Sequence, residues 1–141
     1  HRHADKVRID REDIDGILEE RSLATAPAAV FLGCPHMSAW ELGALGLMLK
    51  GRKVKKGVRV FAATTEVQAV LASRSGWLDP VAGAGVEVLT GTDMSFVNPS
   101  ELGCDSVLTD SARVYRRLNC AGVERGLMKL DDICQDPEVF E

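Results

Sequence analysis

The sequence lacks an apolar run of the roughly 20 residues that a helix needs to cross a bilayer. Glycine, proline or a charged residue interrupts every apolar run within about ten residues, so we expect no membrane-spanning helix and no membrane partner. The chain begins at His1, with neither an initiator Met nor a signal-like apolar stretch. We therefore expect a piece or a processed form of a longer protein, located in the cytoplasm.

The four cysteines, at 34, 104, 120 and 134, include no Cys-x-x-Cys pair, which excludes zinc ribbons and thioredoxin-like redox motifs. Basic clusters are also scarce. The one short cluster, residues 50–56, is not interleaved with aromatic residues, and the net charge is −4. This charge pattern argues against nucleic acid as a partner.

What remains is the composition of a globular protein. Apolar residues make up 45% of the 141 residues and charged residues 27%. The length suits one compact domain and is too short for two. We assign residues 1–27 to an N-terminal helix and linker, and residues 28–141 to an α/β domain.

The chain repeats one pattern four times: a short segment rich in β-branched and small residues, a polar turn and an amphipathic stretch. After a first helix over residues 10–22, this pattern predicts strands at 29–32, 58–62, 86–89 and 106–108. A last strand at 124–128 and a helix from Leu130 complete the chain. The segment after the third strand is broken by Asn98-Pro99 and is expected to be a loop.

Alternating strands and helices predict a three-layer α/β domain, in which helices flank a mainly parallel sheet of four to five strands. The loops that follow the strands of such a sheet meet at its carboxyl edge, where ligands bind. We therefore expect one crevice to be lined by the polar residues of these loops: Cys34, His36, Thr64, Thr65, Thr92, Asp93, Thr109, Asp110 and Ser111.

The stretch Gly33-Cys34-Pro35-His36 places a thiol and an imidazole at the end of the first strand. A helix start near Ser38 and the imidazole would both favour the thiolate, which suits a metal ligand or a nucleophile. The alternative is a buried cysteine whose neighbouring histidine caps the next helix.

Thr109-Asp110-Ser111 precedes a helix and is first of all a capping sequence. The same geometry could hold a carboxylate or phosphate, with Arg113 or Arg116 assisting. Asp93 is either a turn residue or a carboxylate directed into the crevice. Trp40, Trp77 and the leucines are expected in the core or at its rim.

Three segments together resemble the C-terminal part of the large subunit of the aconitase X family. They are LGCPHMSAWELGALGLMLKGRKV, then TTEVQAVLASRSGWL with GVEVLTGTDM, and VLTDSARVYRRLNCAGVERGLMKLDDIC. Members are hydro-lyases that act on cis-3-hydroxy-L-proline or on mevalonate 5-phosphate. The resemblance implies an α/β fold and an iron–sulfur cluster in the complete enzyme.

The resemblance also implies roles for individual residues. Cys34 would bind the cluster, and Asp93 stands where the family has a second cysteine, so these two are the metal-facing candidates. A carboxylate is a harder ligand than a thiolate and suits such a cluster poorly. The loop from Thr109 to Ser111 would lie beside the substrate.

From this resemblance and the expected crevice, His36 and Ser111 are the candidate catalytic residues, although His36 is as well suited to orienting the cluster loop. Five residues are candidates for substrate binding: Thr64, Thr65, Thr109, Asp110 and Ser111. The partners implied are the remainder of the large subunit, a small swivelling subunit and a small hydroxy acid. The chain alone is expected to hold no cofactor.

Three hypotheses for function stay open. The first is a domain or subunit of a dehydratase that is active only with the missing polypeptide, with iron assisting the loss of hydroxide. The second is a non-catalytic α/β module that binds a partner or an anion and whose cluster site has decayed. The third, a cysteine hydrolase or transferase using Cys34 and His36, lacks a residue that would orient the imidazole.

Overall fold

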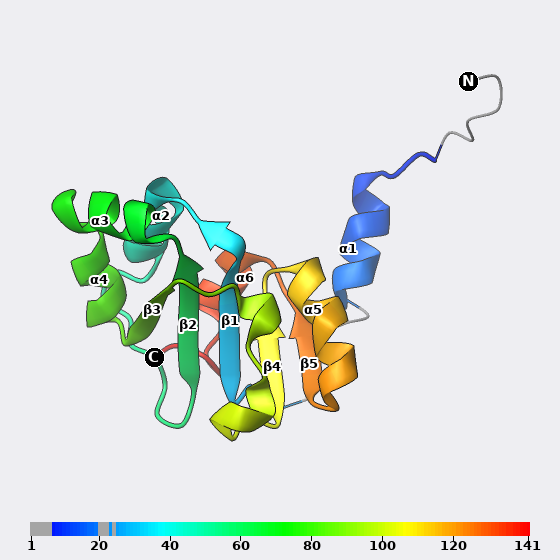
Figure 1. Ribbon diagram of the computed structural model, residues 1–141. Coiled ribbons are helices and arrows are strands. Elements are labelled where there is room, and N and C mark those ends of the chain that lie inside the picture. The colour runs from blue at the N-terminus through cyan, green and yellow to red at the C-terminus, as the bar shows by residue number, and fades with distance from the viewer. Residues whose placement is uncertain (1–6, 20–22, 24) are drawn as a thin grey trace.

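The computed structural model describes residues 7–19, 23 and 25–141, and it shows one sheet with helices on both faces (Figure 1). The five strands are β1 (Ala29–Met37), β2 (Arg59–Thr64), β3 (Val86–Thr90), β4 (Ser106–Thr109) and β5 (Glu124–Leu127). The α-helices are α1 (Arg11–Glu19), α2 (Ala39–Met48), α3 (Glu66–Arg74), α4 (Leu78–Gly83), α5 (Ala112–Leu118) and α6 (Leu130–Gln135). Three 3₁₀ turns are η1 (Met94–Phe96), η2 (Pro99–Leu102) and η3 (Asn119–Ala121).

The sheet confirms the predicted α/β class. All four strand pairings are parallel, and the strands lie in the order β3-β2-β1-β4-β5. The chain moves outward from β1 to β3 on one side and then returns to place β4 on the other side. This reversal makes the gap between the carboxyl ends of β1 and β4 the topological switch point, where open parallel sheets bind ligands.

Alternate side chains of the strands enter two different cores. Val30 and Leu32 of β1 pack with α2, α4 and α6 on one face, in a cluster that includes Leu42 and Leu45. Phe31 faces the opposite way and packs with η1 and α5. Because both faces are covered, the strands are apolar along most of their length rather than alternating with polar residues.

The first strand continues further than the sequence predicts. Gly33 to His36 was expected to be a turn, but β1 extends through it to Met37, with an irregular register between Leu32 and Met37. Gly33 has a φ of 77°, and a Cβ added there would lie 2.5 Å from Met37 Cγ and 2.7 Å from the Ala63 oxygen. Only glycine fits this bend without displacing its neighbours.

The helix after β1 begins where the sequence predicts. The Ser38 hydroxyl accepts a hydrogen bond from the Glu41 N–H, and the Glu41 carboxylate accepts one from the Ser38 N–H at 2.7 Å. This capping box fixes the start of α2 close to the end of β1. The short helix α4 was not predicted from the sequence.

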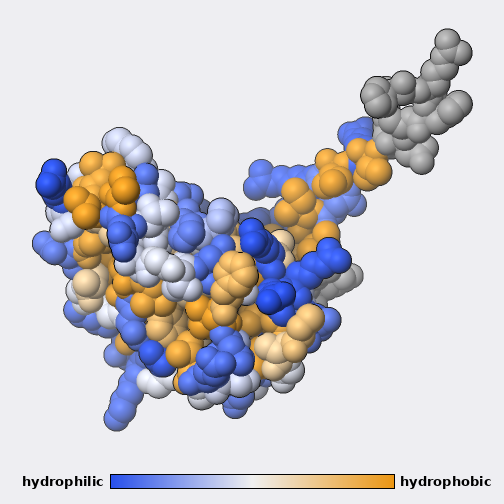
Figure 2. All heavy atoms as spheres, viewed as in Figure 1, coloured by the Kyte–Doolittle hydropathy of each residue, from blue (hydrophilic) through white to orange (hydrophobic). Residues whose placement is uncertain are grey.

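The expectation that Trp40 and Leu47 lie in the core or at its rim was wrong. Trp40 is 76% exposed on α2 and contacts the Trp77 ring at 4.9 Å between centroids, while Leu47 is 77% exposed. Val67, Val70 and Leu71 are also exposed on α3, and Figure 2 shows apolar side chains gathered over that helix. Apolar spacing along a helix does not reveal which apolar side chains have a partner.

The N-terminal helix lies beside the β5 edge of the sheet and extends away from the domain (Figure 1). Asp15 accepts a hydrogen bond from the Lys129 ammonium at 2.6 Å, which also lowers the pKa of that carboxyl. The predicted end of this helix, residues 20–22, lies outside the described residues. In the described part of the chain, every helix is too short or too polar to cross a membrane.

Candidate functional site

The carboxyl edge of the sheet brings together loops from three strands. Cys34 lies in the extension of β1, and Ser111 follows β4, so the two residues flank the switch point. The segment after β3 crosses in front of the sheet and reaches η1 beside α5 (Figure 1). This crossing carries Asp93 from an outer strand to the centre of the edge.

Cys34 and Asp93 form the central contact of this site. The Cys34 thiol donates a hydrogen bond to Asp93 Oδ1 at 3.1 Å. The same carboxylate oxygen accepts the Ser95 N–H at 2.7 Å and thereby caps η1. The interpretation of Asp93 as a turn residue is therefore confirmed, and its role towards a ligand in the crevice stays a prediction.

Their surroundings move the pKa values of these two groups in opposite directions. Burial, followed by the hydrogen bond to Asp93, raises the pKa of the Cys34 thiol. Burial alone would also raise the pKa of Asp93, but the N–H and hydroxyl of Ser95, the thiol and the charge of Arg113 outweigh it and lower that pKa. At neutral pH the pair is a thiol beside a carboxylate.

The expectation that Cys34 is a favoured thiolate was wrong for this reason. It rested on the helix start near Ser38 and on the imidazole of His36. In the structure the thiol is half-buried and its nearest charged partner is a carboxylate, which opposes a second negative charge.

Ser111 and Arg113 complete the centre from the α5 side. The Ser111 hydroxyl accepts the Val114 N–H at 3.4 Å, which caps α5, and it also hydrogen-bonds the Cys34 sulfur, which favours the thiolate. The positive charge of Arg113 favours the ionised form of both Cys34 and Asp93. Sequence reasoning mentioned Arg113 only as an aid to anion binding, because its proximity to Asp93 depends on the crossing segment.

His36 is exposed and is turned towards the loop after β3. Its Nε2 lies 3.1 Å from the carbonyl oxygen of Thr92. Cys34 bonds instead to Asp93 and Ser111, so the structure does not pair the thiol with the imidazole as the hydrolase hypothesis requires. A candidate catalytic role for His36 stays a prediction.

Three of the predicted substrate-binding residues have their polar groups engaged within the protein. Thr64 is fully buried and donates to the Met37 carbonyl at 2.6 Å, and Thr109 is fully buried and donates to the Phe31 carbonyl at 2.7 Å. Thr65 is exposed, but its hydroxyl accepts the Gln68 N–H and caps α3. Their contact with substrate stays a prediction. In the fold, Thr64 and Thr109 each join their strand to β1, and Thr65 starts α3.

Asp110 is turned into the protein. The N–H of Gly33 hydrogen-bonds its carboxylate, so Asp110 links the end of β4 to the bend in β1. Oδ1 is buried, and within the described residues it has no hydrogen-bond partner. Burial raises the pKa of Asp110, despite this N–H, and the Glu41 carboxylate adds to the rise.

The donor groups of this edge do not by themselves fit an iron–sulfur cluster. A cluster takes three or four protein ligands, whereas Cys34 and Asp93 offer two and are bonded to each other. Across residues 7–19, 23 and 25–141 there is no group of three His, Cys, Asp or Glu side chains placed to hold one metal ion. Cys104 and Cys134 are buried on opposite faces of the sheet.

Comparison with known proteins agrees with this fold. Residues 27–136 match the family described as Aconitase X third domain. The phosphomevalonate dehydratase large subunit of Methanothermobacter thermautotrophicus is 30% identical over 133 residues, which are 94% of this chain and 31% of that protein. The large subunit of the same name from Aeropyrum pernix is 28% identical over 127 residues, with 89% and 31% covered.

A solved structure is also similar. The crystal structure of Thermococcus kodakaraensis aconitase X, in its holo-form, superposes with a TM-score of 0.82 and 15% identity, over 95% of this chain and 36% of that one. The chain therefore spans about a third of the length of the relatives that it matches.

Proposed function

The chain belongs to the aconitase X family, and from that membership we propose that it is one domain of a hydro-lyase that removes water from a hydroxy acid. Two relatives carry the name phosphomevalonate dehydratase large subunit, which supports dehydration as the reaction. Because the chain spans about a third of their length, the active enzyme would need further polypeptide. We place this assembly in the cytoplasm.

The proposed substrate is a hydroxyproline-like or phosphomevalonate-like hydroxy acid. It would bind between the carboxyl edge of this sheet and the rest of the enzyme, which comprises the remainder of the large subunit and a small swivelling subunit. The observation that carries this placement is the convergence of Cys34, Asp93 and Ser111 at the switch point.

Dehydration requires one group to accept a proton from carbon and another to protonate the departing hydroxyl. The Ser111 hydroxyl, half-buried beside the Cys34 sulfur, and the exposed imidazole of His36 are our candidates for these proton transfers. A hydroxyl so close to a thiol and a carboxylate can pass a proton along the hydrogen bonds that join them.

Cys34 and Asp93 are the groups that we place towards the cofactor. The family suggests an iron–sulfur cluster in the complete enzyme, and two donors here would leave the other ligands to polypeptide outside this chain. The remaining residues would contribute to substrate binding. Arg113 would attract a carboxylate or phosphate of the substrate. Thr109 and Asp110 would keep β4 and β1 in place at the edge that the substrate approaches.

A second candidate function is a non-catalytic module that binds a partner or an anion. The hydrogen bond between Cys34 and Asp93 favours it, because it keeps the thiol protonated at the position that the resemblance assigns to cluster binding. A thiol that is tied to a carboxylate is a poor ligand until it loses its proton.

A chimera separates the two candidates. Residues 27–136 of this chain would replace the matched part of the Methanothermobacter large subunit, expressed with the other subunit of that enzyme. Dehydration of mevalonate 5-phosphate is then followed by NMR, with Cys34→Ser as a variant that removes the thiol. The dehydratase proposal expects turnover that Cys34→Ser abolishes.

The matched variant Asp93→Cys restores the thiol that the resemblance expects. If the assembled chimera is inactive with Asp93 but active with Asp93→Cys, the second candidate function, the non-catalytic module, is correct. If the chimera assembles and neither form turns over substrate, the dehydratase proposal is wrong.

A further inference from the structure

Helix α3 carries apolar residues on two opposite sides, and only one side is covered. On the covered side Ala72 is fully buried, and Gln68 accepts the N–H of Ala39 in α2 at 2.8 Å. The other side is exposed, and Figure 2 shows it as an apolar area over the helix. We call its three large residues the α3 apolar face: Val67, Val70 and Leu71.

The α3 apolar face is a continuous stripe. Its residues are at positions i, i+3 and i+4, which are neighbours on a helix surface. Val67 is 75% exposed, Val70 53% and Leu71 49%. Stripes of this spacing are typical of a helix side that packs against another element. In the part of the chain that the structure describes, about half or more of each side chain has no such cover.

The two ends of this face carry opposite charges. Glu66 is the first residue of α3 and Arg74 is the last. Both are exposed, and among the described residues neither side chain forms an ion pair or a hydrogen bond. The helix dipole accounts for each charge by itself, but it does not account for the uncovered apolar residues between them.

This arrangement is complementary to itself. Glu66 and Arg74 lie four residues before and four residues after Val70. If two α3 helices pack antiparallel about a two-fold axis at Val70, Glu66 of each copy lies opposite Arg74 of the other. The two apolar faces then meet between two ion pairs, as in helix pairs whose flanking charges set their orientation. A parallel arrangement would place like charges together.

The start of α3 is also close to the candidate site. Glu66 and Val67 line a hollow of about 600 Å³ together with His36 and Asp93. Antiparallel packing would place the end of the second copy's α3 beside Glu66, and therefore at the rim of this hollow. The second copy would narrow the approach to His36 from that side.

We propose that the α3 apolar face binds a second copy of this chain, with the two α3 helices antiparallel and Glu66 of each copy paired with Arg74 of the other. Helix α3 has nine residues and is about 13 Å long. A contact between two such helices is small beside the roughly 1,000 Å² that a stable interface buries, so we expect a weak dimer with a dissociation constant of about 0.1 to 1 mM. The dimer does not rest on the proposed dehydration.

Sedimentation equilibrium of the chain itself, up to about 2 mM, measures the association. Val70→Glu places two carboxylates at the two-fold axis and should raise the dissociation constant at least tenfold. Ile14→Glu is the matched control, because Ile14 is 50% exposed on α1, and it should change the constant less than twofold. Far-ultraviolet circular dichroism checks that both variants are folded.

Charge reversals identify the partner as a second copy. Glu66→Arg leaves two cations on the face and Arg74→Glu leaves two anions, so each variant alone should associate about tenfold more weakly, since the two-fold axis repeats the repulsion. An equimolar mixture of the two variants restores both ion pairs and should associate within about threefold of the wild type. Backbone amide shifts in a labelled variant, on addition of the unlabelled other, should appear first in α3.

Three results would overturn the proposal: a wild-type chain that stays monomeric at about 2 mM, an equal loss of association in Ile14→Glu, or a mixture of the charge variants that does not associate. A monomeric chain whose α3 amides are protected from hydrogen exchange only in the assembled chimera would assign the face to the remainder of the large subunit instead. An inactive chimera, together with a chain that dimerises as described, would reject the dehydratase and support the dimer.

Discussion

The two faces of the sheet are built differently. On one face, α2, α4 and α6 cover a continuous apolar cluster in which Leu42, Leu45 and Ile133 are fully buried. On the other face, one short helix and two 3₁₀ turns cover a smaller cluster around Phe31 and Met94. The first face therefore carries the larger apolar cluster, whereas the second has hollows and polar groups at its surface.

The difference follows from how each face is connected. The segments that follow β1 and β2 fold into helices on the first face, and their caps lie in the sequence itself, at Ser38 and Thr65. The segment that follows β3 is interrupted by Asn98 and Pro99 and crosses the second face as turns. An irregular crossing cannot fill a face as a long helix does, and it places polar residues such as Asp93 over the centre of the sheet.

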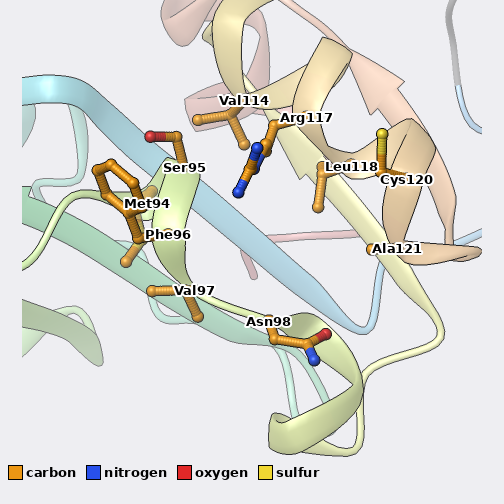
Figure 3. A pocket seen from close by; sticks show the side chains of 10 residues that line it. All are labelled: Met94, Ser95, Phe96, Val97, Asn98, Val114, Arg117, Leu118, Cys120 and Ala121. Atoms are coloured by element: carbon orange, nitrogen blue, oxygen red, sulfur yellow. The ribbon is translucent and has the colours of Figure 1, made fainter.

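A matched pair of core truncations gives the largest expected effect. Leu42→Ala leaves a closed cavity under α2 and should lower the free energy of unfolding by about 4 kcal/mol. Leu118→Ala on the second face lies beside the hollow of Figure 3 and should cost about 2 kcal/mol, because the space opens to solvent. Urea denaturation measures both, and equal losses would contradict the comparison.

The next largest effect is expected at the bend in β1, where Gly33→Ala is compared with a glycine substitution at an open turn. Gly33→Ala should lower the free energy of unfolding by about 3 kcal/mol, since it adds a clash with Met37 and Ala63 to the strain of a positive φ. Gly51→Ala has a φ of 80° and meets nothing within 4 Å, so about 1 kcal/mol is expected. A Gly33→Ala variant no less stable than Gly51→Ala would show that the bend does not constrain the edge.

The sequence predicted the positions of the five strands, though not their order in the sheet, because each strand is a short run of apolar, mostly β-branched or small residues next to a polar turn. It also predicted that Cys34, Asp93 and Ser111 meet at one edge, since the loops that follow parallel strands share an edge. Helix starts at Ser38 and Ser111 were found for a local reason, as each hydroxyl caps the helix that follows it.

What could not be predicted depends on contacts between distant segments. A turn was expected after Leu32, yet pairing with β2 extends β1 to Met37. The Cys34 thiol was expected to be acidic from its own neighbours. Burial, and then the carboxylate of Asp93 from 59 residues along the chain, raises its pKa instead, and both causes depend on the fold. Trp40 was expected in the core or at its rim, but it is exposed, because the spacing of apolar residues along a helix does not show which of them another element covers.

The buried carboxyl of Asp110 predicts a smaller, pH-dependent effect. Its pKa is raised in the folded state, so the stability that its protonated form provides is complete below the unfolded pKa of about 3.9 and is lost as the pH rises through the folded pKa. Asp110→Asn keeps an oxygen for the Gly33 N–H and removes the titration. The free energy of unfolding of the variant, measured against that of the wild type, should therefore improve from pH 4 to pH 7.

Asp132→Asn is the control for that experiment, since Asp132 is exposed on α6. If the free energy of unfolding rises equally with pH in both variants, relative to the wild type, the cause is the loss of one negative charge. The burial of Asp110 between β4 and the bend would then not explain the effect.

The most direct test concerns the Cys34–Asp93 contact, on which the candidate site rests. Alkylation of each thiol is followed by mass spectrometry from pH 6 to pH 10, in the wild type and in Asp93→Asn, with the exposed Cys120 as the internal reference. In the wild type Cys34 should titrate above its ordinary pKa, because of burial and then of the adjacent carboxylate; Asp93→Asn should lower that pKa and speed alkylation at neutral pH. A Cys34 that titrates identically in both proteins would contradict the pairing and with it the placement of the site at the switch point.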